Sequence, residues 1–191
     1  MTCLQFEIKH QWNSTPVDHR PINIKLSSDH DNQCVLMEVE GPFFNDPSAP
    51  SGMAGKPFPN LWDYEVVEAF FLGEQDRYLE VELCPHGQHL LLQLNGMRNM
   101  LKDELSIDFN ATIDGDTWHG VAKIPMKYFP PKTTKFNAYA IHGSGDGRIY
   151  EALYPTPHGK YKEPDFHRLE YFQEESFKDI ITDTPGLWNT R

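Results

Sequence analysis

The chain has 191 residues, and its 17 Lys and Arg residues are outnumbered by 28 Asp and Glu residues, which gives a formal net charge of −11 at pH 7. This length suits one domain with a substantial hydrophobic core. Because a negative surface repels phosphate backbones and anionic lipid headgroups, and no Lys/Arg-rich run offsets the charge, we expect neither a nucleic-acid partner nor a membrane partner.

The chain begins with a short alternating segment rather than an apolar one. Residues 1–10 (MTCLQFEIKH) carry charges at Glu7 and Lys9, whereas a secretory signal needs an unbroken apolar stretch of about 7–15 residues. No segment reaches the roughly 18 apolar residues of a membrane span. The three cysteines are odd in number and widely spaced, which does not indicate a disulfide framework. We therefore expect a cytoplasmic protein with reduced thiols.

Alternation of polar and apolar residues dominates the chain, and helical periodicity is scarce. Residues 4–8 (LQFEI) and 22–26 (INIKL) alternate strictly, and residues 34–39 and 64–72 are further segments rich in strand-forming residues. A period of two is typical of strands that bury one face. The pattern predicts strands in all four segments.

Three longer segments each contain a turn signal between two strand patterns. The turns are Pro85-His86-Gly87 within residues 77–94, Asp114-Gly115-Asp116 within residues 106–124, and the glycine-rich stretch 143–147 within residues 136–153. Pro, Gly and Asp favour the backbone conformations of tight turns, so each segment predicts a hairpin of antiparallel strands. Turns at this spacing are typical of a β-sandwich, in which each sheet buries one face against the other.

Other segments lack a strand pattern. Residues 41–60 are rich in Pro and Gly, and residues 154–165 form a second irregular stretch. The strongest helix signal lies at residues 174–181, where three apolar residues can form a short stripe. Because the sequence shows no internal repeat and no domain boundary, we expect one all-β domain over residues 1–191, an antiparallel β-sandwich with one or two short helices.

One predicted strand carries several polar side chains on a single face. Alternation places Tyr78, Glu80 and Glu82 opposite the apolar residues of the same strand, and Glu68 lies on the strand before it. Carboxylates two positions apart lie roughly 7 Å apart along a strand, within the range of about 5–9.5 Å used by paired glycosidase acids. Carboxylates also accept hydrogen bonds from sugar hydroxyls. The face allows three interpretations: a solvated outer surface, a contact with a sugar or other small ligand, or catalysis.

The next strand predicts a continuation of this polar face. His89 and Gln93 lie on the face opposite three leucines of their own strand. If the two strands pair around the three-residue turn, we expect these side chains near Glu82 and Tyr78. A face with Tyr, Glu, His and Gln side chains can hold a polar ring against an aromatic surface. Leu91 shares this face, so a covering layer or a partner is the alternative.

Two residues in the last third of the chain are further binding candidates. Arg148 opens a strand after the glycine-rich turn. There its guanidinium can grip a carboxylate or a pair of sugar hydroxyls, or pair with a structural Glu. His167 is either a ligand contact or a hydrogen-bonded residue that anchors a crossing loop.

The segment 84–89 (CPHGQH) places a thiol close to two imidazoles. Common zinc sites need a second pair of ligands at matched spacing, and none is evident. A haem site needs an axial His or Met over an apolar pocket, and the sequence singles out no such residue. The chain has no Gly-x-Ser-x-Gly elbow and no Cys in an electropositive setting. We therefore expect no metal, no cofactor and no catalytic residue.

Three stretches in this order resemble a known group of sandwich domains. They are residues 61–71 (LWDYEVVEAFF), 78–87 (YLEVELCPHG) and 164–172 (PDFHRLEYF). Together they resemble family-nine carbohydrate-binding modules of the DOMON-like group, and the whole chain resembles an animal family of about this length. The resemblance implies a jelly-roll-like sandwich with a sugar ligand, although some relatives bind haem. Trp62 matches the tryptophan before the Val-Glu strand, and sugar-binding members typically use aromatic side chains beside polar groups.

The leading prediction is a non-catalytic domain that binds a carbohydrate or a similar polyhydroxylated small ligand. The candidate binding residues are Trp62, Glu68, Tyr78, Glu80, Glu82, His89, Gln93, Arg148 and His167. A glycoside-processing enzyme with paired Glu residues is the first alternative. A protein-interaction module is the second, because four large apolar residues of the segment 41–60 would dock a partner if they were exposed. These four are Phe43, Phe44, Met53 and Phe58.

Overall fold

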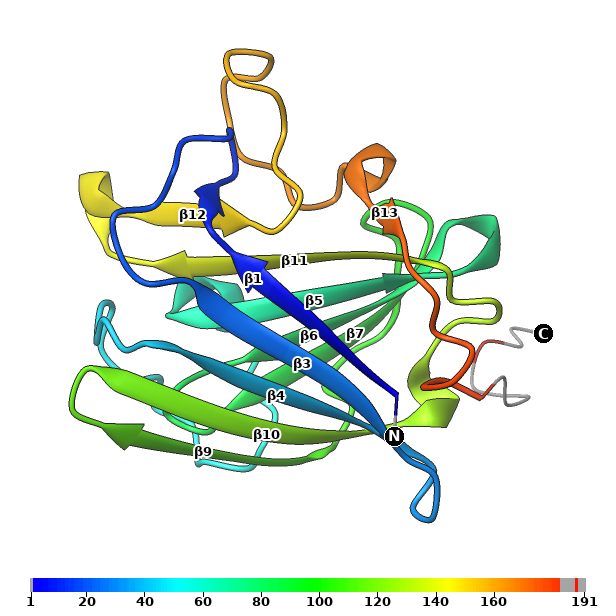
Figure 1. The fold of residues 1–191 in the computed structure, drawn as a ribbon. Coiled ribbons are helices and arrows are strands. Elements are labelled where there is room, and N and C mark those ends of the chain that lie inside the picture. The colour runs from blue at the N-terminus through cyan, green and yellow to red at the C-terminus, as the bar shows by residue number, and fades with distance from the viewer. Residues whose placement is uncertain (1, 183–187, 189–191) are drawn as a thin grey trace.

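The computed structural model describes residues 2–182 and residue 188, which fold into two antiparallel sheets packed against each other (Figure 1). The smaller sheet has five strands in the spatial order β1-β3-β4-β10-β9. Its strands are β1 (Cys3–Ile8), β3 (Ile22–Asp29), β4 (Cys34–Pro42), β10 (Thr117–Pro125) and β9 (Asp108–Asp114). The predicted antiparallel β-sandwich is confirmed.

The larger sheet has eight strands, in the order β2-β12-β11-β5-β6-β7-β8 with β13 beside β11. Its strands are β2 (His10–Gln11), β12 (Ile149–Ala152), β11 (Lys135–His142), β5 (Val66–Leu72), β6 (Arg77–Leu83), β7 (His89–Asn95), β8 (Met100–Lys102) and β13 (Gln173–Glu174). The three predicted turns each connect two paired strands, β6 to β7, β9 to β10 and β11 to β12, so the three predicted hairpins are confirmed.

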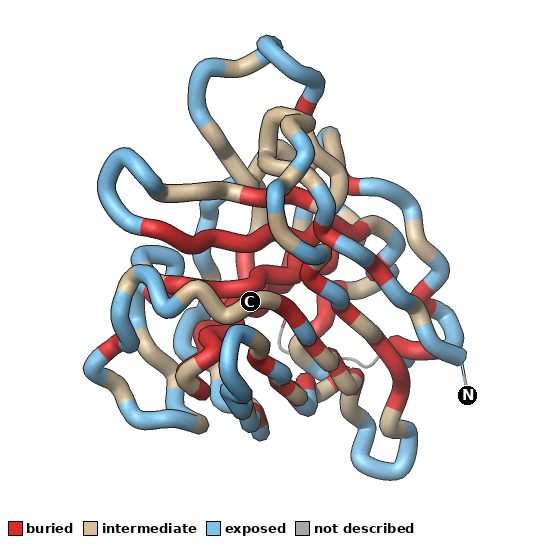
Figure 2. Tube along the Cα trace, turned by 60° about the vertical axis from the view of Figure 1, so that its left-hand side comes forward, coloured by how far each residue is buried: buried red, intermediate tan, exposed pale blue. Residues whose placement is uncertain are grey.

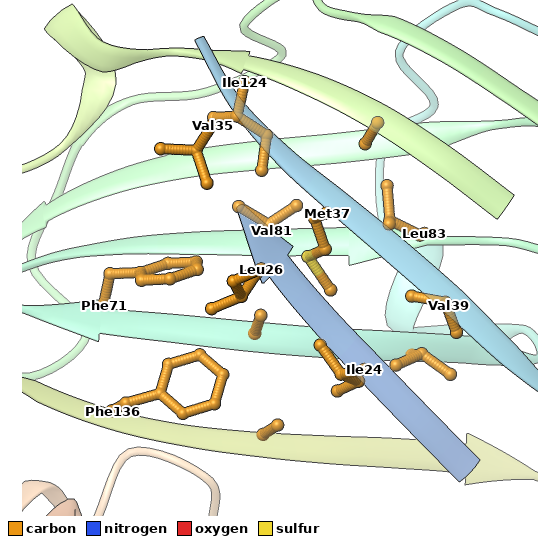
Figure 3. Packing of buried hydrophobic residues seen from close by; sticks show 14 of the residues in the cluster. Ile24, Leu26, Val35, Met37, Val39, Phe71, Val81, Leu83, Ile124 and Phe136 are labelled. Atoms are coloured by element: carbon orange, nitrogen blue, oxygen red, sulfur yellow. The ribbon is translucent and has the colours of Figure 1, made fainter. Parts of the chain in front are cut away.

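The main hydrophobic core lies between the two sheets. Strands contribute alternate residues to it, because successive side chains of a strand point to opposite faces. Figure 3 shows residues of β3, β4 and β10 packed against residues of β5, β6 and β11. The labelled members are Ile24, Leu26, Val35, Met37, Val39, Ile124, Phe71, Val81, Leu83 and Phe136. Full burial of one such side chain contributes about 1.5–3 kcal/mol.

The larger sheet is also buried on its outer face, the face that points away from the smaller sheet. A second apolar cluster lies there, and the segment 154–172, drawn in orange in Figure 1, adds Phe166 and Phe172 to it. Figure 2 shows long buried stretches in the strands and exposed residues mainly in the connections. All seven residues of β5 are buried. Burial therefore does not distinguish the two faces of this strand.

The predicted helix at residues 174–181 is wrong. Residue 174 ends the strand β13, and the N–H groups of Ile180 and Ile181 then donate to the carbonyl of Phe177 in a turn. These three apolar residues are still buried in the main core, so the apolar stripe identified the contacts but not the backbone.

The helices found among the described residues are single 3-10 turns. They are η1 (Leu61–Asp63), η2 (Glu74–Asp76), η3 (Met126–Tyr128), η4 (Gly145–Gly147) and η5 (Leu169–Tyr171). Within this part of the chain, no helix has the length and the apolar character needed to cross a membrane.

The segment 41–60 packs its aromatic residues onto the sandwich. Phe43 contacts the main core and Phe58 contacts the outer cluster. Phe44 stacks on an imidazole ring with the ring centroids 3.6 Å apart. Met53 is 70% exposed. The expected exposure of all four residues is therefore wrong, because Phe43, Phe44 and Phe58 are half-buried against the sandwich.

Candidate functional site

A cavity of about 340 Å³ lies on the outer face of the larger sheet, beside the segment 154–172. Its apolar and aromatic wall consists of Trp62, Leu92, Leu94, Met100, Ile141, Tyr150, Pro164 and Phe166. Its polar wall consists of Glu68, Glu80, Arg98, Asp165 and His167. Small-molecule sites typically combine an apolar wall with a few polar groups in a volume of about 300–1,000 Å³. We call this space the outer cavity.

Three glutamates lie together at the outer cavity and just behind its wall. The register of β5 and β6 places Glu68 directly opposite Glu82, and Glu80 lies two residues from Glu82 on the same face of β6. One carboxyl oxygen of each residue lies within 4.8 Å of the others. The structure thus brings these three residues together, as the alternation predicted.

The carboxyl groups of this cluster are buried. The exposed fractions are 2% for Glu68, 3% for Glu80 and 0% for Glu82. At least one buried oxygen of each residue has no hydrogen-bond partner among the described residues. The interpretation as a solvated outer face is therefore wrong. Buried polar atoms without partners favour a ligand that supplies those partners.

Burial raises the pKa of each carboxyl group in the cluster. It raises the pKa of Glu80 to about 7. Burial first and repulsion by neighbouring carboxylates second raise the pKa values of Glu68 and Glu82 well above the usual range. A protonated carboxyl group donates one hydrogen bond and also accepts. At neutral pH the cluster can therefore serve both the oxygen and the proton of a ligand hydroxyl.

Tyr78 and His167 connect β6 to the segment 154–172, which covers the outer face of the larger sheet. The Tyr78 hydroxyl accepts a hydrogen bond from the Arg98 backbone N–H at 3.0 Å and lies 2.6 Å from Nδ1 of His167. The hydroxyl proton is then available for Nδ1, which assigns the imidazole proton to Nε2. Burial lowers the pKa of His167 to about 4, so the ring is neutral at pH 7. His167 therefore has the predicted anchoring role and also lines the outer cavity.

Trp62 lines the outer cavity, and Arg148, which does not, contacts the turn that carries Trp62. Trp62 is 40% exposed and lies in η1. The Arg148 guanidinium donates to the backbone carbonyl of Trp62 and, at 3.1 Å, to that of Asp63. Arg148 thus binds backbone carbonyls, not the predicted structural Glu. These contacts tie the backbone of η1 to the start of β12.

The predicted polar face on β7 is wrong. The Cys84 N–H donates to the Gln88 carbonyl at 3.0 Å, and this closure pairs Leu83 with His89. Because paired residues share a face of the sheet, His89 and Gln93 point into the sandwich with Leu83. Leu90, Leu92 and Leu94 lie on the face of the glutamates instead, whereas Leu91 lies in the main core.

The two β7 residues have structural surroundings. Gln93 donates from Nε2 to the Tyr128 carbonyl at 3.0 Å. His89 is fully buried, and neither of its ring nitrogens has a hydrogen-bond partner in the described part of the chain. Neither residue lines the outer cavity. The structure therefore separates them from the other candidate binding residues.

Several residues of the outer cavity are not among the predicted binding residues. Asp165 and Phe166 lie within the motif at residues 164–172, so that motif was a signal for them. Arg98 follows β7 and forms an ion pair with Asp165 at 2.7 Å. No motif surrounds Arg98. Its place in the wall depends on the covering segment, which is distant in sequence.

Two groups within the described residues have ligand atoms close enough to hold a metal ion. One is the glutamate cluster, and the other consists of His19, His142 and Glu151. The segment 84–89 contributes to neither group. Burial raises the pKa of the Cys84 thiol to about 12, which disfavours the thiolate that binds zinc.

Comparison with known proteins identifies close relatives in animals. The UPF0462 protein C4orf33 homolog of Danio rerio is 54% identical over 182 residues, which cover 93% of this chain and 91% of the relative. The homolog of Mus musculus is 52% identical over 194 residues, covering 97% of this chain and 100% of the relative. The chain belongs to the UPF0462 family. The protein C4orf33 of Homo sapiens is 51% identical over 182 residues, covering 93% of this chain and 90% of its own length. No family model matches the chain.

A solved structure shares the fold of this UPF0462 chain. It is a candidate carbohydrate-binding protein from Bacteroides uniformis ATCC 8492, with a TM-score of 0.66 and 15% sequence identity. The match covers 91% of this chain and 85% of the other. At this identity the likeness concerns the fold. The expected membership of an animal family is confirmed by the relatives above.

Proposed function

We propose that the outer cavity binds a carbohydrate or a similar polyhydroxylated small ligand without transforming it. One observation carries the proposal: an exposed indole, Trp62, and unpartnered carboxyl oxygens of Glu68 and Glu80 line the same cavity. A sugar ring has an apolar face that packs on an aromatic ring and hydroxyl groups that both donate and accept hydrogen bonds. The cavity offers a partner for each.

The polar residues of the cavity wall can each donate or accept hydrogen bonds with ligand hydroxyl groups. Glu68 and Glu80 supply carboxyl groups that donate when protonated and accept in either state. Arg98 and Asp165 pair with each other at 2.7 Å and leave further donor and acceptor positions for hydroxyl groups. The volume of about 340 Å³ lies at the small end of the usual range for ligand sites. We therefore propose a ligand of one or two sugar rings.

The name of the structural neighbour and the motif resemblance support the same ligand class. That neighbour is a candidate carbohydrate-binding protein, and the three ordered motifs resemble family-nine carbohydrate-binding modules of the DOMON-like group. Both likenesses concern the fold, and the side chains of the cavity carry the proposal. We further propose that the protein acts in the cytoplasm, where the ligand would be an intracellular saccharide or glycoconjugate.

A panel of mono- and disaccharides tests this function by thermal shift and by calorimetry. We expect at least one sugar at millimolar concentration to raise the melting temperature, because a ligand of the folded state stabilises it. Trp62→Ala should weaken that sugar about tenfold or more through loss of the stacking surface. Met53→Ala, a change at another exposed residue, is the control and should bind normally. If no sugar of the panel changes the melting temperature, the proposal fails.

Glycoside processing is a second candidate function, because two buried acids share the cavity. Glu68 and Glu80 have oxygens within 4.8 Å of each other, and burial raises the pKa of both carboxyl groups. Paired acids, one of them with a raised pKa, are typical of glycoside hydrolysis. Release of nitrophenol from aryl glycosides measures it. Activity in the wild type that Glu80→Gln removes and Glu104→Gln keeps would favour the enzyme; Glu104 is exposed.

A further inference from the structure

Three side chains from separate parts of the chain meet at the inner face of the larger sheet, away from the outer cavity. Glu151 lies on β12, His142 ends β11, and His19 lies in the connection between β2 and β3. Nε2 of His19 lies 2.7 Å from Oε1 of Glu151, and Nε2 of His142 lies 2.6 Å from the same oxygen. Two imidazole nitrogens and one carboxylate oxygen thus point at one place.

Burial makes this carboxylate unusual. The Glu151 side chain is 0% exposed, and the two imidazoles are 14% and 11% exposed. The second oxygen of Glu151, Oε2, has no hydrogen-bond partner among residues 2–182 and 188. A buried carboxylate oxygen without a donor is costly unless a cation or another donor satisfies it.

The surroundings orient both imidazoles for a metal. Nδ1 of His19 lies 2.7 Å from the Arg20 carbonyl and donates to it, so Nε2, which donates to Glu151 in this structure, can present its lone pair to a metal that displaces its proton. Metal-binding histidines commonly have this outer hydrogen bond to a carbonyl. Phe44 stacks on the His142 ring at a centroid distance of 3.6 Å. The backbone N–H of Phe44 donates to Oε1 of Glu65 at 3.0 Å, which holds Phe44 in this position.

The turn between β11 and β12 fixes the two sheet residues. Gly143 has φ +80, and a Cβ at this position would lie 2.2 Å from the Gly147 carbonyl oxygen. Only glycine fits such a turn. The pairing of Ala140 with Glu151 then places Glu151 diagonally across from His142 on the same face.

We propose that His19, His142 and Glu151 bind one Zn²⁺ ion. Two imidazole nitrogens and a carboxylate oxygen form a ligand set that zinc uses when a fourth position is left for water or a small ligand. All three residues line a cavity of about 480 Å³, whose wall also carries Asp18 and Asp46. This cavity leaves space for the fourth ligand, and its carboxylates favour a cation.

The adjustment needed for the metal is small. In a tetrahedral site, zinc–ligand distances of about 2.0–2.2 Å separate neighbouring ligand atoms by about 3.3 Å, so the two contacts to Glu151 must open by less than 1 Å. His19 lies outside the regular strands, which allows its ring to shift while β11 and β12 keep their positions. The alternative is a metal-free network in which the imidazoles only pair with the carboxylate.

Metal titration of the tag-free, chelator-treated protein distinguishes the two. We expect one equivalent of Zn²⁺ per chain after dialysis, measured by elemental analysis, and a higher melting temperature with Zn²⁺. His19→Ala and Glu151→Gln should each weaken Zn²⁺ binding about tenfold or more. His158→Ala removes an exposed imidazole and should bind as the wild type does. Equal binding by all variants, or none by the wild type, would overturn the proposal.

A second measurement uses the wild type alone and so does not depend on the folding of any variant. X-ray absorption of the Zn²⁺-loaded wild type should show nitrogen and oxygen neighbours at about 2.0–2.2 Å with imidazole scattering, and Co²⁺ in place of Zn²⁺ should give the intense visible absorption of a tetrahedral site. Sulfur neighbours at about 2.3 Å would assign the metal to cysteines and overturn the site.

Discussion

The two faces of the larger sheet bury carboxyl groups in opposite ways. On the outer face, Glu68, Glu80 and Glu82 lie together, and burial raises the pKa of each. On the inner face, burial also acts to raise the pKa of Glu151, but hydrogen bonds from His142 and His19 outweigh it, and that pKa lies below the usual value.

This contrast shows that partners, rather than burial alone, set the charge of a buried acid. In the glutamate cluster of the outer face, burial outweighs the attraction of Arg98 and Arg148, so the pKa values stay raised and the unpartnered oxygens have hydrogen-bonding capacity left for a ligand. The inner carboxylate is charged and already paired, so it stabilises the junction of β11, β12 and the connection that carries His19. The outer cluster suits reversible binding, and the inner one suits a fixed structure or a metal.

Removal of one imidazole partner of Glu151 should have the largest effect on the free energy of unfolding. His142→Ala leaves Glu151 with a single imidazole and also removes the stacking contact of Phe44. Loss of one partner from a buried ion pair typically costs about 3–5 kcal/mol. Urea unfolding in the presence of a chelator measures the change without a metal contribution. His158→Ala should be neutral, and a cost below about 1 kcal/mol for His142→Ala would mean that the inner pairing is weak.

The buried glutamates of the outer face should make the free energy of unfolding fall as the pH rises. Because the Glu80 pKa is about 7 in the folded chain against 4.5 for the free group, its stabilising contribution is complete below pH 4.5. That contribution is lost as the pH rises to about 7. The loss is on the order of 3 kcal/mol.

Urea unfolding at pH 5 and pH 8 checks this sign. The free energy of unfolding should fall between the two pH values in the wild type, and Glu80→Gln should reduce the fall, because glutamine does not ionise. Glu104→Gln alters an exposed residue and should leave the fall unchanged. Equal pH dependence in the wild type and Glu80→Gln would show that Glu80 is not the titrating group.

The sequence predicted the sandwich because period-two patterns and turn residues are local signals. The same signals placed the three outer glutamates on one face, since β5 and β6 are neighbours along the chain and in the sheet. They failed for β7, because the larger sheet is apolar on both faces and Leu90, Leu92 and Leu94 lie in the apolar cluster of its outer face rather than in the main core. Hydrophobicity then identifies a buried face without showing which one.

The inner cluster could not be predicted from local signals. His19 and Glu151 lie 132 positions apart in the sequence, and neither belongs to a motif with the spacing of metal ligands. The strand order that joins β2 to β12 is what brings them together. The outer cavity depends in a similar way on the segment 154–172, whose irregular course has no periodicity from which its contacts could be inferred.

His89 is another histidine on the inner face, and its replacement should have the smallest effect on stability. His89 is fully buried like Glu151, but its ring nitrogens have no partner among the described residues. Burial, with a smaller contribution from Lys56, lowers the His89 pKa to about 4. Leucine of similar size removes the unsatisfied ring, so His89→Leu should stabilise the fold by about 1 kcal/mol at pH 8.

The pH dependence of that gain distinguishes it from simple repacking. A depressed pKa contributes stability above the ordinary histidine value of 6.5, and this contribution is lost as the pH falls toward about 4. The wild type should therefore weaken between pH 8 and pH 5, while His89→Leu should not, and the advantage of the variant should grow at pH 5. A constant difference at both pH values would mean that His89 keeps an ordinary pKa. In that case the His89 imidazole would have a hydrogen-bond partner, as the imidazoles of His19 and His142 do.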